Sequence, residues 1–146
     1  MMTVQQWEAH RSFADWIDRV NPSFAYDVAQ RFLKAAETSD ADLAVAKPIR
    51  EAHRRRMSEL LRPGTVVVLP TAPSPAPLYG LRQSEMQGVR RRIIELTCIA
   101  GGIGAAQVNL PAVEVDGLPV GLSLIAAAGA DEMLLALAQE MSEILD

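Results

Sequence analysis

The feature that most constrains the fold is an Asp-Gly pair, Asp116-Gly117, between two apolar runs. The runs read QVNLPAVEV and LPVGLSLIA. A two-residue type I′ turn needs a positive φ at both central positions, and an Asp-Gly pair meets that need. We therefore predict an antiparallel hairpin over residues 107–125.

A further strand is expected upstream of the hairpin. The run TVVVLP is apolar and rich in β-branched residues, which is typical of a strand buried on both faces. We place this strand near residues 65–69 and expect it to be a central strand. Such a strand needs neighbours on both sides and cover on both faces. Three strands with mixed connections supply few of these, so the chain is expected to hold only part of a sheet.

Helical periodicity fills most of the remaining sequence. Thr3 with Gln6 favours a first helix, and Ser39 with Asp42 favours a third, because both pairs fit the capping box. Between them, Asn-Pro at positions 21 and 22 is expected to end the first helix and cap the second. Pro48 should kink or restart the third helix.

Two more helices are predicted, near residues 85–100 and from Asp131 onward. The expected fold class is therefore α/β: a mixed sheet, with a strand near 65–69 and a hairpin near 107–125, flanked by helices. Residues 1–63 form its helical segment and residues 64–146 its mixed α/β segment.

Composition excludes several classes of protein. The net charge of −4 argues against a dedicated nucleic-acid binder. A single cysteine, Cys98, excludes an internal disulfide and fits a reducing compartment. There is no apolar run of about 18 residues and no signal-peptide pattern, so no membrane segment is expected. The predicted location is the cytoplasm.

The glycine-rich stretch around Gly102 and Gly104 invites comparison with a nucleotide-binding loop. The dinucleotide fingerprint needs a third glycine and must follow a strand, but here the third position is Gln107 and a helix comes first. A close turn between helix and sheet is the better interpretation. No cofactor is expected.

Other chemically interesting residues favour structural interpretations. His10 and His53 are distant in sequence and lack companions at metal-ligand spacing, so no metal is expected. Cys98 is interpreted as a small core residue. The two arginine runs, at 54–56 and 90–92, are interpreted as solvated or ion-paired because no aromatic residues are interleaved with them.

Serine chemistry is also unsupported by local pattern. Ser74 and Ser123 lack glycines on both sides, which a nucleophile turn usually has. The only lysines, Lys34 and Lys47, lie in the helical half. The chain is therefore expected to supply no catalytic residue.

Four motifs nevertheless point to a family. VVVLPTAPSPAP, LTCIAGGIGAAQVNLP, GLPVG and the closing helix with its acidic start occur in this order. They closely resemble the C-terminal third of amidase-signature enzymes, and the resemblance covers essentially the whole chain. One departure is Ala106, where the family often has proline.

The resemblance implies a scaffold without its chemistry. The family hydrolyses amides with a serine nucleophile, a second serine and a lysine base, and nothing here matches the stretch that holds the serines. By resemblance, Pro70, Thr71, Thr97 and Gly104 are expected to be walls of a substrate pocket. The expected function is the C-terminal part of an amide hydrolase that is inactive alone, whether a truncated gene product, one piece of a split enzyme or a fragment expressed on its own.

The expected partners follow from that interpretation. They are the missing N-terminal amidase portion or a second copy of the chain, and a small-molecule amide substrate only in the complete enzyme. Neither nucleic acid nor a membrane is expected as a partner. The alternative is a non-catalytic, partner-binding module derived from the amidase fold.

Overall fold

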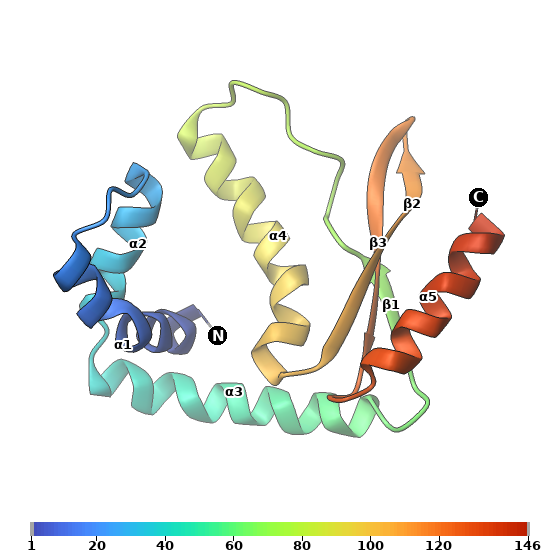
Figure 1. Cartoon of the computed structure of the whole chain (residues 1–146), viewed down its shortest axis with the longest axis horizontal. Coiled ribbons are helices and arrows are strands. Elements are labelled where there is room, and N and C mark those ends of the chain that lie inside the picture. The colour runs from blue at the N-terminus through green and yellow to red at the C-terminus, as the bar shows by residue number, and fades with distance from the viewer. Residues whose placement is uncertain (1, 146) are drawn as a thin grey trace. The chain divides into compact units, whose positions relative to one another are not determined.

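The computed structural model describes residues 2–145 (Figure 1). The chain divides into two compact units, one ending at His53 and the other beginning at Arg54. The elements in chain order are α1 (Met2–Val20), α2 (Tyr26–Ala36), α3 (Asp40–Leu60), β1 (Val67–Pro70), α4 (Gln83–Ile103), β2 (Ala106–Val115), β3 (Leu118–Ala126) and α5 (Asp131–Leu145).

The unit that ends at His53 is helical. Ser39 caps α3 as expected: its Oγ accepts from the Asp42 N–H at 3.2 Å, and its own N–H donates to Asp42 Oδ2 at 3.0 Å. Asn21 ends α1 as expected, with a φ of 45° and its N–H donating to the Ile17 carbonyl, but it does not cap α2, whose N-cap is Ala25. A left-handed asparagine after a helix satisfies an orphan carbonyl there. α3 continues through Pro48 without the restart considered for this position.

The second unit holds a three-stranded sheet of order β1-β3-β2. The hairpin prediction is confirmed, because β2 and β3 pair antiparallel around Asp116 (φ 53°) and Gly117 (φ 73°). A bulge interrupts the register between Leu110 and Val113. The α/β fold class is likewise confirmed, although both pairings among the described strands are antiparallel where a mixed sheet was expected.

The expected central position of the first strand is wrong for the described part of the chain. β1 is an edge strand, and its Val68 is 52% exposed. The central strand is β3, in which Leu124 and Ile125 are fully buried. Apolar content alone does not distinguish the two positions, since only the pairing decides which strand is enclosed.

Helices cover both faces of this sheet (Figure 1). On one face α5 packs Leu134 and Ala138 against Leu124 and Leu110. On the other, Ala100 of α4 and Leu61, just after α3, pack with Ile125. The unit is therefore a helix–sheet–helix sandwich, and this sandwich positions the site described next.

Candidate functional site

A cavity of about 310 Å³ lies in the second unit, beside the proline-rich segment that follows β1. Pro70 and the chain after it form one side, Leu96 of α4 contributes another, and the hairpin supplies the rest. The lining residues are Pro70, Ala72, Pro73, Ser74, Pro75, Leu96, Val113, Val115, Val120, Gly121 and Leu122. Small-molecule sites are commonly concave and mostly apolar in this way.

Next to this cavity, four polar side chains form one hydrogen-bonded group, here called the Thr71 cluster: Thr71, Gln107, Asn109 and Ser123. Ser123 is its centre and is only 1% exposed. Its Oγ donates to Asn109 Oδ1 at 2.6 Å, accepts from Gln107 Nε2 at 2.9 Å and lies 2.9 Å from Thr71 Oγ1. Buried polar groups are stable only when they are bonded, and the cluster meets that need.

Strand pairing brings this cluster together. Ser123 lies directly opposite Asn109 on β2 and opposite Leu69 on β1. Gln107 lies two residues before Asn109 and so projects from the same face of the sheet. Thr71 follows the end of β1 and reaches back over β3. Three segments distant in sequence thus meet at one buried hydroxyl.

Gly121 makes the reach of Thr71 possible. The Thr71 N–H donates to the Gly121 carbonyl at 2.7 Å. A Cβ at position 121 would lie 2.8 Å from Thr71 Oγ1, closer than real Cβ atoms approach, and 3.1 Å from Thr71 Cβ, which is a tight contact. Glycine is therefore required here for close approach of the proline-rich segment to the sheet.

The four residues expected to line a substrate pocket do not all lie at the same place in the structure. Pro70 lines the cavity, and Thr71 fastens the segment that continues that lining. Thr97 is exposed, and its hydroxyl donates to the Ile93 carbonyl within α4 at 3.0 Å. Gly104 lines a different, smaller cavity. The structure thus brings together two of the four residues.

That smaller cavity, of about 130 Å³, lies where α4 ends. Gly104 adopts a φ of 73° there and closes the helix, and its N–H donates to Ala100. The Arg54 side chain lies alongside, with its Nε donating to the Ile103 carbonyl at 3.2 Å. A cation at the negative end of a helix is a stabilising arrangement, so we assign Arg54 and Gly104 a structural role.

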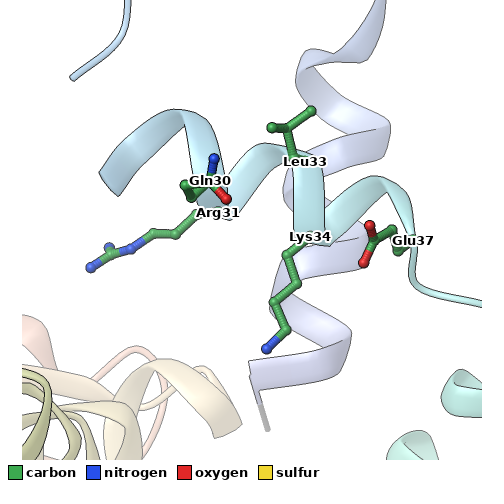
Figure 2. A pocket seen from close by; sticks show the side chains of 5 residues that line it. All are labelled: Gln30, Arg31, Leu33, Lys34 and Glu37. Carbon is green, nitrogen blue, oxygen red and sulfur yellow. The ribbon is translucent and has the colours of Figure 1, made fainter. Parts of the chain in front are cut away.

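A larger hollow, of about 680 Å³, lies in the first unit (Figure 2). It is not a binding site in form, because, of the described residues, one helical surface alone lines it. Its five lining residues come from a single helical surface: Gln30, Arg31, Leu33, Lys34 and Glu37. They lie along α2 and its end in Figure 2. Among residues 2–145, no second element contributes a lining residue, so we attach no chemistry to this surface.

The other candidate residues do not assemble into a reaction centre. The hydrogen-bond partners of Ser123 are Thr71, Gln107 and Asn109 rather than a base, and Ser74 donates to the adjacent Pro75 carbonyl. Cys98 is a free, half-buried thiol on α4. Nε2 of His53 is buried without a hydrogen-bond partner among the described residues, although the residue as a whole is only partly buried.

Residues 2–145 contain neither a cluster of metal-binding side chains nor a helix that could span a membrane. No group of three or more His, Cys, Asp or Glu in this range could hold a metal ion. Among the same residues, no helix is both long enough and apolar enough to cross a membrane.

Sequence reasoning missed Gln107 and Asn109 as functional neighbours of Thr71. A signal was present, since two amides separated by one residue on an otherwise apolar strand must share a face. What could not be read from the sequence was that the proline-rich segment lies over that face.

Comparisons with known proteins show which family this chain matches. The Amidase family model matches residues 7–135. The chain belongs to the amidase family. It is 31% identical to "Amidase 1" of Oryza sativa subsp. japonica, over 99% of this chain and 34% of the rice protein. The chain thus spans about a third of the length of this relative, which fits the expectation that it corresponds to one segment of a longer amidase.

Two further proteins are similar to this chain, a solved amidase structure and a protein with a different name. The solved "Crystal structure of amidase" superposes with a TM-score of 0.77 at 25% identity, over 99% of this chain and 34% of that one. A pea protein, "Translocon at the outer membrane of chloroplasts 64", is 29% identical over 99% of this chain and 24% of its own length. The chain is therefore also similar to a protein named for a role other than amide hydrolysis.

Proposed function

We propose that this chain is the C-terminal part of an amide hydrolase and contributes one wall of its substrate pocket. The observation that carries the proposal is the family match across residues 7–135 together with a span of about a third of its amidase relatives. In this proposal the serine nucleophile and the lysine base come from the remaining two thirds. That portion belongs either to a longer protein or to a separate polypeptide.

The geometry of the second unit supports a wall and not a reaction centre. The cavity is lined largely by proline, alanine, valine and leucine, which can hold a substrate but cannot move a proton. Amide hydrolysis needs a nucleophile and an acid–base group within reach of the reacting carbon. A wall alone has no such step to accelerate, so the isolated chain should hydrolyse no amide.

Within the proposed wall, Pro70 contacts the bound substrate directly and Thr71 fastens the segment that continues the wall. Thr97 and Gly104 are retained from the family resemblance as wall residues of the complete enzyme. Leu96 supports that role for α4, because it lines the cavity one residue before Thr97. The substrate is proposed to be a small-molecule amide, and the place of action the cytoplasm.

Reconstitution tests this proposal. The chain is co-expressed with the first two thirds of the rice amidase to which it is similar, and hydrolysis of simple aliphatic and aryl amides is measured. Activity should appear in the pair and be absent from either piece. A pair whose first piece carries alanine at its nucleophilic serine is the control for contaminating hydrolases.

The isolated chain provides the opposite test. Turnover of these amides by the purified chain would contradict the proposal. Cys98→Ala and Ser74→Ala variants of the chain would then show whether either side chain is responsible, since loss of activity in one of them would reveal an unrecognised nucleophile.

The partner-binding module is retained as a second candidate because of the exposed aromatic rings in the first unit. Phe13 is 49% and Trp16 40% exposed, and Phe13, Trp16, Phe24 and Phe32 form one contiguous group of ring contacts. Apolar surface of this kind is usually covered in solution. The missing amidase portion or a second copy of the chain would cover it, and light scattering distinguishes the two.

A further inference from the structure

We propose that the cavity beside the proline-rich segment selects amides whose non-reacting portion is uncharged and apolar. This inference rests on the proposed function, because it names the substrate class that the wall would admit. It is carried by three observations on the second unit: the chemistry of the lining, the face of the hairpin that contributes to it, and the way the segment is fixed.

The lining contains no ionisable side chain. Among the lining residues, none is Asp, Glu, Lys, Arg or His, and the only side-chain polar group is the hydroxyl of Ser74. An unpaired charge taken out of water into such surroundings loses its hydration and gains no partner. The lining therefore penalises an ammonium or a carboxylate on the bound group.

The hairpin excludes its charged residues from this lining. Val113 lies opposite Val120, and Val115 follows two residues later on the same face. Glu114 lies between the two valines and, because side chains alternate along a strand, projects from the other face. The acidic turn residue Asp116 is also absent from the lining. Neutrality of the cavity is thus a consequence of the strand register.

The cavity wall is also fixed in place. Thr71 bonds the Gly121 carbonyl through its N–H and the buried Ser123 through its hydroxyl. The prolines at 73 and 75 then restrict the backbone of the following residues. Every member of the Thr71 cluster is neutral, so the anchor itself offers no counter-ion to a charged ligand.

Ligand titration of the full chain tests the inference without requiring catalysis. Three primary amides of nearly equal shape are compared: butanamide, β-alaninamide, which has an ammonium in place of the methyl group, and succinamate, which has a carboxylate there. NMR chemical shifts of the backbone amides are followed. Butanamide should give saturable shifts at Val113, Val115 and Gly121, and both charged analogues should bind at least about tenfold more weakly.

A charged variant sharpens the test. Val115 is 44% exposed, so the fold should tolerate Val115→Lys, which places an ammonium on the lining. This variant should shift the preference toward succinamate over butanamide by about tenfold or more. Leu135→Lys makes the same charge change at a 62% exposed position on α5, outside the cavity, and should leave the preference unchanged.

The outcomes separate this inference from the proposed function. Equal binding of the three ligands, binding of none, or shifts confined to residues outside the lining would overturn it. Selective binding of butanamide by a chain that gives no active pair on reconstitution would uphold the cavity's selectivity while refuting the proposed hydrolase.

Discussion

In the unit that begins at Arg54, Leu124, Ile125 and Leu134 are fully buried between a sheet and the helices on its two faces. In the unit that ends at His53, the buried apolar cluster is small and comprises Val4, Leu43 and Ala46, with Trp7 packed on it. Two aromatic rings of that unit, Phe13 and Trp16, remain substantially exposed.

The difference indicates that the second unit is stabilised mainly by its own buried core. A sheet covered on both faces buries enough apolar surface to hold a register, and the Thr71 cluster depends on that register. The helical unit leaves apolar side chains such as Phe13 and Trp16 exposed to water, which is typical of a surface that binds another protein. We therefore expect mutations to have large effects in the second unit and small ones in the first.

The largest expected effect is the truncation of Leu134, which is 1% exposed. Leu134→Ala should lower the free energy of unfolding of the second unit by about 2–5 kcal/mol, since it leaves a cavity between α5 and the sheet. Hydrogen exchange of residues 106–126 measures this effect. Fluorescence reports the first unit separately, because Trp7 and Trp16 are the only tryptophans.

Leu135 is the matched control, because it is adjacent on α5 yet 62% exposed. Leu135→Ala should change stability by no more than about 0.5 kcal/mol. Equal effects of the two substitutions would contradict the packing described for α5. A shift of the tryptophan transition along with hydrogen exchange in Leu134→Ala would show that the two units unfold together, which would break the comparison between them.

The next effect concerns Gly121. Gly121→Ala should destabilise the second unit by about 1–3 kcal/mol, because the new Cβ collides with Thr71 and the surroundings must shift. Thermal unfolding followed by circular dichroism measures it.

The control for Gly121 has the opposite expected sign. Gly88 lies inside α4 with nothing within 4 Å of a Cβ at that position. Gly88→Ala should therefore stabilise the chain by about 0.5–1 kcal/mol through helix propensity. A Gly121→Ala protein as stable as the unmodified chain would show that glycine at 121 has no special requirement for space.

A smaller effect is expected from Ser123→Ala, which removes the central hydroxyl of the Thr71 cluster. The loss should be about 0.5–1.5 kcal/mol, because Asn109 and Gln107 are accessible enough to bond water instead. Urea denaturation measures it, with the exposed Ser74→Ala as a near-neutral control. An unchanged midpoint in Ser123→Ala would refute a structural contribution from the cluster.

These contrasts also show where sequence reasoning succeeded. The turn at Asp116-Gly117 and the cap at Ser39 depend on backbone preferences of neighbouring residues, and both were predicted. The edge position of β1 was missed because pairing is decided by distant strands. The Thr71 cluster was missed for the same reason, since it needs the register that sets Ser123 opposite Asn109. Asn21 was predicted both to end the first helix and to cap the second, and only the first of these roles is confirmed.

The smallest expected effect lies in the first unit, at the start of α3. The hydroxyl of Ser39, 2.6 Å from Asp42 Oδ2, and the Ser39 N–H both hold the pKa of the Asp42 carboxyl below its ordinary value of 3.8. A carboxyl with a lowered pKa in the folded state contributes stability above its unfolded pKa. That contribution is lost as the pH falls through the lower, folded value. The helicity of α3 should therefore decline slightly as the pH is lowered below about 3.8.

Asp42→Asn isolates this contribution, because the amide keeps the shape of the side chain and cannot titrate. Circular dichroism of the two proteins should converge at the acid end of the titration and differ slightly at neutral pH, where only the aspartate carries a charge. Screening by water keeps the difference small at an exposed site such as this one. A parallel acid response in the two proteins would assign the transition to other carboxyls. A response in Asp42→Asn larger than that of the unmodified chain would reverse the sign argued here.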